Sequence, residues 1–503
     1  MSRRVSRRDV LRASAASVLA GCARPGEPRY AAPPVSTPEL PWGVQSGDVT
    51  TNSAVIWCRS DRPARMMVDW ALSERFDVVT RIRGPLVSIG GDLIGKVALS
   101  GLPGGTRIHY RVRFDDSPWC SGSFGTAPTD ARDVLLAWSG DTNGQGWGID
   151  PSRGGMPAYR TLLDRSPDVF VHCGDAIYAD GPIPESVALE DGTVWRNLVD
   201  PAKVRVAETL ADFRGAHLYP RRSAEVRALS AAVPHLGIWD DHEVRDNWFP
   251  GEHLTDERYR ERSVDALAVP ALRAWYDYTP TLRTPRGPMY RKMAWGPLVD
   301  VFLLDGRSYR SANEPAPSAF LGDVQAAWLL EALAASKATW KIIACDMPIG
   351  VGTWETGTTI ARAFDGWANE DPGPPREREI ELAGLLSGMR ARGVKNVVWV
   401  TADVHYAAAH RFDPGRAAFK DFDPFWELIA GPMHATSFPQ KATDATFGTE
   451  VVWSSANGDR LGSPATGDTS FGLLRIDGRT RTLTVSFVNG HGRDLHRLVL
   501  DPR

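Results

Sequence analysis

The feature that most constrains the fold is a series of short apolar runs, each followed closely by acidic residues or histidine. Four such runs lie beyond residue 128, and longer stretches that include helical periodicity separate them. Apolar strands that alternate with helices predict a layered α/β domain. The runs and the residues after them are 135–138 before Ser139-Gly140-Asp141, 169–173 before Gly174-Asp175-Ala176-Ile177-Tyr178, 235–239 before Asp240-Asp241-His242-Glu243, and 397–400 before Thr401-Ala402-Asp403-Val404-His405.

The acidic and histidine residues after these runs are expected to converge on one site. In a layered α/β sheet, the carboxyl ends of neighbouring parallel strands open onto one edge, where ligands bind. Converged carboxylates repel one another and raise each other's pKa values, so the cluster needs cations. Oxygen ligands, two histidines and a phenol suit Fe, Mn, Zn, Mg or Ca and argue against a thiolate structural zinc site. A pair of ions bridged by one carboxylate is the usual device for displacement at phosphorus.

Each of these motifs alone has an ordinary structural explanation. A Gly-Asp pair after a strand is common, Asp240-Asp241 can cap a helix, and His405 alone can be a core or surface histidine. Four such strand ends in one chain favour a metal site over these separate explanations.

Composition divides the chain into four parts. Residues 1–22 have the features of an export signal, and residues 23–40 are rich in Pro, Ala, Ser and Thr, which predicts an extended linker. Residues 41–128 contain short strand-like runs with turn punctuation, which predict a small all-β sandwich domain. Residues 129–503 form the predicted catalytic domain. Strands are expected at 53–59, 65–71, 96–99 and 108–114, and the clearest helices at 156–165, 322–336 and 376–392.

The amino terminus carries two targeting signals. The segment around Arg7 and Arg8 resembles the twin-arginine export signal, and the apolar stretch that follows it is too short to span a bilayer. Leu19-Ala20-Gly21-Cys22 resembles the bacterial lipobox, in which the cysteine is lipidated. We expect recognition by the twin-arginine machinery, export to the periplasm or cell surface, and a lipid anchor at Cys22. Ordinary signal cleavage, which would release a soluble protein, is the alternative.

Charge and cysteine content narrow the possible partners. The 61 acidic residues outnumber the 58 basic ones, so the net charge is −3 and strong nucleic-acid binding is not expected. Cys58 and Cys120 are candidates for a disulfide in an oxidising compartment, but their connectivity cannot be derived from sequence. Cys173 and Cys345 lie in apolar runs and are expected to be buried thiols. We expect a monomer.

The three motifs Gly174-Asp175-Ala176-Ile177-Tyr178, Trp239-Asp240-Asp241-His242-Glu243 and Ala402-Asp403-Val404-His405 resemble the metal-site motifs of PhoD-type alkaline phosphatases. These enzymes belong to the calcineurin-like metallophosphoesterase superfamily. Segments 304–310 and 321–329 resemble further parts of the family, and the resemblance covers essentially the whole mature chain. It implies a four-layer metallophosphoesterase-type sandwich preceded by a small fibronectin-like domain. It also implies an exported dinuclear-metal phosphatase or phosphodiesterase that hydrolyses phosphate esters.

The resemblance also implies roles for individual residues. Asp175 would bridge the two metals, Tyr178 and His405 would bind the first metal, which is ferric iron in this family, and Asp241 and Asp403 would bind a second, calcium-like ion. His242 would stabilise the transition state or protonate the leaving oxygen, with Glu243 or Asp240 orienting its ring.

One position departs from the family pattern. Better-known PhoD enzymes have a cysteine at the end of the first strand, whereas this chain has Asp141, an arrangement similar to that of purple acid phosphatases. Mn, Zn or Mg therefore stay open as alternatives to Fe(3+) and Ca(2+). Asn143, in the loop 142–148, is a candidate phosphate contact, and so is Asn247, for which a plain turn residue is the alternative.

Two rival functions stay open at this level. The first is a nuclease or a phospholipase D-like diesterase that uses the same metal chemistry. The second is a non-catalytic, metal-binding surface lipoprotein. The presence of His242 beside the metal ligands favours catalysis, because a structural cation needs no proton donor.

Overall fold

The computed structural model describes residues 36–312, 318–353, 364–456 and 458–503. The predicted export signal, with Arg7, Arg8 and Cys22, and most of the predicted linker 23–40 lie outside the described residues. Residues 38–503 form one compact unit.

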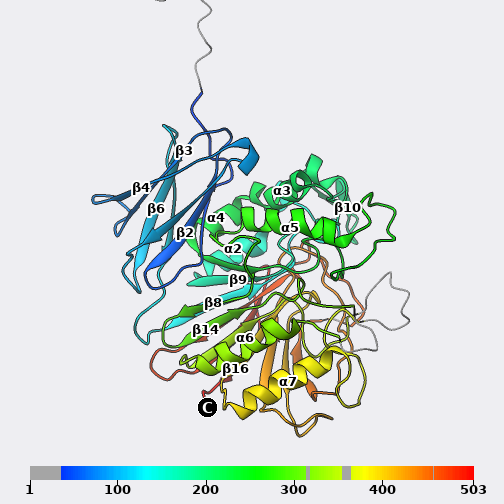
Figure 1. The fold of residues 1–503 in the computed structure, drawn as a ribbon. Helices are drawn as coiled ribbons and strands as arrows, with labels where there is room; N and C mark the ends of the chain where they lie inside the picture. The colour runs from blue at the N-terminus through cyan, green and yellow to red at the C-terminus, as the bar shows by residue number, and fades with distance from the viewer. Residues whose placement is uncertain (1–35, 313–317, 354–363, 457) are drawn as a thin grey trace, which may run out of the picture. The chain divides into compact units, whose positions relative to one another are not determined.

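Two large β-sheets form the centre of this unit (Figure 1). The first sheet has nine strands in the order β22 (Asp494–Leu500), β21 (Leu483–Asn489), β20 (Ser470–Ile476), β8 (Val134–Ser139), β9 (Val169–Cys173), β12 (His235–Ile238), β1 (Val44–Gly47), β2 (Ser53–Arg59) and β5 (Ile94–Ser100). The second sheet has seven strands in the order β13 (Arg291–Trp295), β14 (Val299–Leu303), β15 (Trp340–Ala344), β16 (Val397–Thr401), β18 (Phe425–Ile429), β17 (Ala408–Phe412) and β19 (Thr449–Ser454).

The inner faces of the two sheets share one hydrophobic core. Leu136 and Val171 of the first sheet belong to the same buried cluster as Val301 and Ile342 of the second. Every residue of β8 and β9 is buried, because these strands are covered on both faces. This double burial explains why their sequences are continuous apolar runs rather than alternating ones.

Helices cover the outer face of each sheet and complete a four-layer sandwich. On the first sheet, Leu162 of α2 (Pro157–Asp164) and Leu229 of α4 (Ala224–Ala232) pack with Phe170. On the second sheet, α6 (Gly322–Ala335) and α7 (Arg378–Ala391) pack against Phe302 and Ile343. The helices expected at 156–165, 322–336 and 376–392 are thereby confirmed as α2, α6 and α7. Two further helices, α3 (Leu210–Leu218) and α5 (Val264–Tyr278), share a cluster with Trp239.

The amino-terminal strands form a β-sandwich that joins the first sheet. A four-stranded sheet of order β4 (Thr80–Leu86), β3 (Arg65–Ala71), β6 (Arg107–Phe114) and β7 (Cys120–Gly125) shares core residues with β1, β2 and β5. β1 runs parallel to β12 through the pair Gly47 and His235. A Cβ atom on Gly47 would lie 2.6 Å from the His235 carbonyl oxygen, so only glycine allows this approach. Residues before 128 therefore share a sheet with later ones, and the division into domains at that point stays a prediction.

The remaining elements are short. They are the hairpin β10 (Ser186–Ala188) and β11 (Val194–Arg196), and the 3-10 helices η1 (Ile89–Gly91), η2 (Pro151–Arg153), η3 (Pro201–Lys203) and η4 (Pro220–Arg222).

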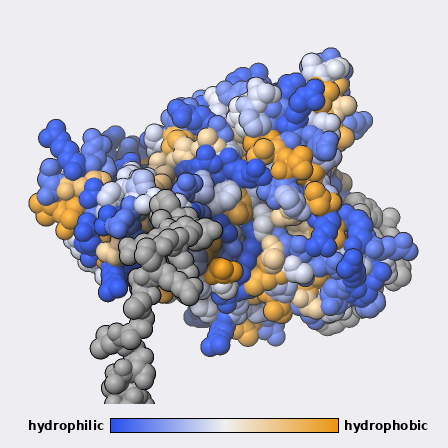
Figure 2. Space-filling model, turned by 90° about the horizontal axis from the view of Figure 1, so that it is seen from above, coloured by the Kyte–Doolittle hydropathy of each residue, from blue (hydrophilic) through white to orange (hydrophobic). Residues whose placement is uncertain are grey.

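The described cysteines form no disulfide bonds, and the surface is mostly hydrophilic on the face shown in Figure 2. Cys58, Cys120, Cys173 and Cys345 are free thiols in this structure, and Cys173 and Cys345 are buried, as expected. Hydrophilic residues make up most of the face shown in Figure 2, and hydrophobic residues lie on it in small separate groups. Within the described part of the chain, no helix has the length and apolar character needed to cross a membrane.

Candidate metal centre

The carboxylates and histidines predicted from the strand ends come from both sheets. Asp141, Asp175 and Asp241 follow β8, β9 and β12, which are parallel neighbours in the first sheet. Asp403 and His405 follow β16, which belongs to the second sheet. The expectation that neighbouring strands of one sheet supply all of these residues is therefore corrected. Face-to-face packing of two sheets brings the carboxyl ends of β8 and β16 to the same place.

Two glycines allow these strand ends to approach closely. A Cβ atom on Gly140 would lie 2.7 Å from the Ala402 Cβ, across the interface between the sheets. Gly174 has a φ of +102°, and a Cβ atom there would lie 2.4 Å from the Asp240 Cβ. Each glycine immediately precedes an aspartate of the site, so lack of space requires glycine at both positions, and the positive φ requires it also at Gly174.

The first cluster of ligand atoms contains Asp141, Asp175 and His405, whose ligand atoms lie within 4.8 Å of one another. The Tyr178 hydroxyl lies 2.7 Å from His405 Nε2, which places the phenol at the same point. Both carboxylate oxygens of Asp141 are buried and have no hydrogen-bond partner among the described residues. A buried carboxylate without donors is costly, so this donor set fits a bound cation.

A second cluster shares members with the first. Asp240, Asp241 and Asp403 form one group of potential ligands, and Asp175, Asp241 and His242 form another. Asp175 therefore belongs to the cluster around His405 and to the cluster around Asp241. This shared position is where a carboxylate that bridges two cations would have to lie.

The electrostatics of the protein alone are unfavourable at this point. Burial, together with the charges of neighbouring carboxylates, raises the pKa values of Asp141 and Asp175 well above their usual range. Burial and the nearby charge of Asp241 raise the pKa of Asp403 to about 8. Burial lowers the pKa of His405 to about 3, so its ring is neutral and able to act as a ligand. The protein supplies less positive charge here than its carboxylates require.

Backbone strain is concentrated in the same loops. A positive φ is uncommon for residues other than glycine and often marks a functional site. Six of the residues named from the sequence have φ between +53° and +69°: Asp141, Asn143, Asp175, Asn247, Asp403 and His405.

The partner of His242 differs from the one expected. Its Nδ1 lies 2.8 Å from Asp180 Oδ1, so the prediction that Glu243 or Asp240 orients this ring is corrected. The Tyr178 ring packs against the His242 ring at a centroid distance of 4.1 Å, with the two planes tilted by 30°. Burial alone would lower the pKa of His242, but the carboxylates of Asp180 and Asp241 raise it to about 10.

Glu243 instead holds the backbone of the loop after β9, which carries Asp175. Its carboxylate accepts hydrogen bonds from the backbone N–H groups of Asp175, Ala176 and Asp240, at 3.1, 2.7 and 2.8 Å. It thereby ties the loops after β9 and β12 together. This role follows from tertiary contacts and had no signal in the local sequence.

Arg307 is a charged group that the sequence analysis did not assign to the site. It is fully buried, and its Nη2 lies 2.6 Å from Asp240 Oδ1 and 2.7 Å from Asp365 Oδ2. Arg310 adds a second buried guanidinium in contact with Asp365 and Asp346. The sequence did contain a signal for this part of the structure. Asp305 and Asp346 follow the strands β14 and β15 in the same way as the aspartates at the four strand ends recognised from the sequence.

The two asparagines lie in the loops of the site. The Asn143 side chain is 2% exposed, and both its amide atoms lack a hydrogen-bond partner among the described residues. The backbone N–H of Asn247 donates to Asp241 Oδ2 at 2.6 Å. The amide of Asn143 is thus available to a ligand, while the backbone of Asn247 supports the carboxylate of Asp241, a potential metal ligand.

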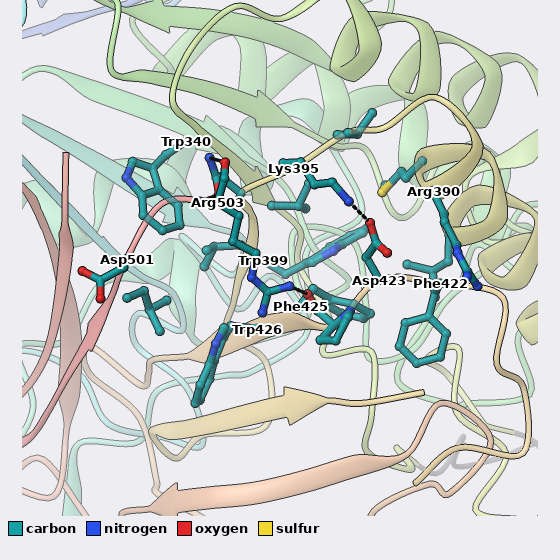
Figure 3. A pocket seen from close by; sticks show the side chains of 18 of the residues that line it. Trp340, Arg390, Lys395, Trp399, Phe422, Asp423, Phe425, Trp426, Asp501 and Arg503 are labelled. Atoms are coloured by element: carbon teal, nitrogen blue, oxygen red, sulfur yellow. Dashed lines mark hydrogen bonds and ion pairs between the residues drawn. The ribbon is translucent and has the colours of Figure 1, made fainter. Parts of the chain in front are cut away.

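A separate hollow of about 200 Å³ lies at the opposite edge of the second sheet (Figure 3). Its lining includes Trp340 and Val397, the first residues of β15 and β16, whereas the potential metal ligands Asp403 and His405 come after the last residue of β16. Lys395 forms an ion pair with Asp423 there, so these opposite charges compensate each other. None of the potential metal ligands lines this hollow.

Comparison with known proteins identifies the family. The model of the PhoD-like phosphatase family matches residues 136–487, and the model of the PhoD-like phosphatase N-terminal domain matches residues 25–128. The chain belongs to the PhoD-like phosphatase family. It is 27% identical over 410 residues to alkaline phosphatase D of Bacillus subtilis (strain 168). This alignment covers 75% of this chain and 66% of the Bacillus protein, so the chain matches just under two thirds of that relative's length.

Solved structures show the same fold. The structure of PhoD superimposes with a TM-score of 0.68 and 19% identity, over 93% of this chain and 90% of that one. A purple acid phosphatase from yellow lupin (Lupinus luteus) seeds matches with a TM-score of 0.53 and 12% identity, over 92% of this chain and 74% of that one. The four-layer sandwich is therefore the metallophosphoesterase fold, and the small β-sandwich before it matches the N-terminal domain of the family.

We predict that Arg307→Met destabilises the protein strongly. Removing one partner of a buried ion pair leaves an uncompensated charge and costs about 3–5 kcal/mol in the free energy of unfolding. Arg160→Met is the matched control, because its Nε contacts Asp164 at 3.2 Å with both side chains more than 60% exposed. We expect the control to cost less than about 0.5 kcal/mol. Urea denaturation of both variants measures the difference, and equal midpoints would contradict the role given to Arg307.

Proposed function

We propose that this protein hydrolyses phosphate esters at a dinuclear metal centre. The observation that carries the proposal is that Asp175 belongs to two overlapping clusters of buried ligand atoms in a chain of the PhoD-like phosphatase family. Two cations that share one carboxylate can act together on a single phosphate group.

The donor atoms divide into two unlike sets. Asp141, Tyr178 and His405, together with Asp175, offer carboxylate, phenol and imidazole donors, which suit ferric iron. Asp241 and Asp403, with Asp175, offer carboxylate oxygens, which suit a hard divalent ion such as Ca(2+). We propose this pair of metals, with Mn, Zn or Mg as alternatives that metal analysis distinguishes.

When bound, such ions would neutralise phosphate charge and lower the pKa of a water molecule. The residues of the chain would do the rest. Asp180 holds His242 at Nδ1, so Nε2, which lies 3.8 Å from Asp246 Oδ1, is the atom that would donate a proton to the departing oxygen. The unpaired amide of Asn143 is available to orient a phosphate oxygen.

The rival functions have less support. A net charge of −3 offers no general attraction for nucleic acid, which disfavours a nuclease. A non-catalytic metal site would not require the hydrogen bond between His242 and Asp180. Assays on a phosphate monoester and a diester decide between phosphatase and phosphodiesterase activity.

We predict that Asp175→Asn lowers hydrolysis more than any other single ligand change and reduces the bound metal. Loss of a bridging carboxylate affects both cations, so the decrease is expected to be at least about 100-fold. Asp164→Asn, on the exposed surface of α2, is the control and is expected to retain metal and activity. Elemental analysis and hydrolysis of p-nitrophenyl phosphate are the measurements. Full activity of the wild type after prolonged dialysis against EDTA would rule out a metal-dependent mechanism.

We predict that His242→Ala keeps both metals and loses hydrolysis, by about 10²- to 10⁴-fold for alkyl esters. The loss should be smaller for p-nitrophenyl esters, because nitrophenolate departs without a proton whereas an alkoxide does not. Asp180→Asn should show the same ester dependence in weaker form, since it acts through the His242 ring. Loss of a metal in His242→Ala would identify His242 as a ligand, and equal losses for both ester classes would exclude proton donation.

We also propose that the protein is exported and lipid-anchored at Cys22, on the basis of the twin-arginine and lipobox patterns in the sequence. Cys22→Ser is expected to move the protein from the membrane fraction to the soluble fraction, because the acylated residue is lost. Cell fractionation and immunoblotting measure the change. An unchanged distribution would contradict the anchor.

A further inference from the structure

A second cavity lies in the helical layer over the first sheet and has no role in the metal chemistry. It has a volume of about 100 Å³ and is lined by side chains from β9, β12, α3, η4, α4 and α5. None of the potential metal ligands lines it, although Ala176, the residue after Asp175, does. The cavity is therefore separate from the candidate metal centre, but it touches the loop after β9 that carries Asp175.

Arg221 is the only charged residue among the described residues that line this cavity. Its side chain is 7% exposed, and its guanidinium lies over the Trp57 ring at 4.0 Å. Nη2 donates to the side chain of Gln45 and to the Tyr278 carbonyl oxygen. Nη1 is buried and has no hydrogen-bond partner among the described residues.

No carboxylate compensates this guanidinium. Within the described residues, no aspartate or glutamate lies within 4.0 Å of Arg221, in contrast to Arg307 with its carboxylate partners. Burial lowers the pKa of Arg221 to about 10, which still leaves the side chain charged at neutral pH. The fold thus keeps a full positive charge beside this cavity without a carboxylate among the described residues to neutralise it.

The other polar groups of the cavity are neutral hydrogen-bonding groups. Burial lowers the pKa of His172 to about 4 and the pKa values of His217 and His235 to about 3, so none of these rings is charged at neutral pH. His217 stacks on Tyr278, and its Nε2 is buried without a hydrogen-bond partner among the described residues. A neutral imidazole can place its single proton on this nitrogen and donate it into the cavity.

An anion matches this combination of groups. Charge-assisted hydrogen bonds from a guanidinium are stronger than those it makes to neutral acceptors, and an isolated buried charge is unfavourable. The cavity is larger than the roughly 10–15 Å³ that one water requires, so an ion with accompanying water fits. We propose that this cavity binds one small monovalent inorganic anion of the size of chloride, held by Arg221 Nη1 and His217 Nε2. A single charge is favoured because only one guanidinium is present.

The position of the site connects it to the metal loops. His172 lines the cavity, and its Nε2 lies 3.1 Å from the hydroxyl oxygen of Thr142. Thr142 is the residue after Asp141. The anion would therefore lie behind both the loop that carries Asp141 and the loop that carries Asp175. Its expected effect is to stabilise the folded protein.

The direct test is crystallography of the metal-loaded wild-type protein in bromide. We expect an anomalous bromide peak in the cavity, next to the Arg221 guanidinium. Electron density that fits water alone at this place, without an anomalous signal, would overturn the proposal. This measurement does not depend on whether any variant folds.

A thermal stability experiment tests the same site in solution. Chloride should raise the unfolding midpoint of the wild type, on the order of 1–2 °C, relative to the large anion gluconate at equal ionic strength. Arg221→Met should abolish this difference. Arg222→Gln, whose guanidinium pairs with Asp200 nearer the surface, is the matched control and should keep it. An equal response of Arg221→Met and the wild type would count against the site.

Discussion

Compensation of buried negative charge is the interaction on which the rest of this structure depends. Asp141, Asp175 and Asp241 are almost fully buried, Asp403 is partly buried, and all four belong to the overlapping clusters of potential metal ligands. Water has little access to these carboxylates, so they must be neutralised, paired or bound to cations. Arg307 supplies part of the positive charge from behind the site. Neither oxygen of Asp141 has a hydrogen-bond partner among the described residues, so positive charge is still lacking at the clusters of potential metal ligands.

The loops that carry these carboxylates are held rigidly by the surrounding structure. The loops after β8, β9 and β16 hold several residues at positive φ, a conformation that persists only when the surrounding structure enforces it. Two packed sheets provide that enforcement, because each loop is fixed at its start by a fully or almost fully buried strand. Glu243 fixes the loops further through three backbone hydrogen bonds. The proposed site, in which two cations lie close together, would require this precision.

Two buried arginines show how differently the same residue type can be used. Arg307 forms ion pairs with buried carboxylates, which neutralise its charge inside the fold. Arg221 is buried to a similar degree but contacts a neutral amide, a carbonyl oxygen and an aromatic ring. The first arrangement lies beside the potential metal ligands, while the second leaves a buried positive charge that no carboxylate of the described residues neutralises. Their sequences give no sign of this difference, since each lies in a short segment with a second arginine close by.

The sequence by itself determined the layered fold, the main helices and the set of strand-end ligands. Continuous apolar runs define buried parallel strands, and the residues after them must lie at the carboxyl edge whatever the details of packing. Tertiary structure decided the rest. That Asp180 holds His242, that Glu243 binds backbone N–H groups, and that Arg307 pairs with Asp240 depend on contacts between segments more than 60 residues apart. Such pairings carry no local periodicity, because they arise only when two sheets pack face to face and bring distant loops together.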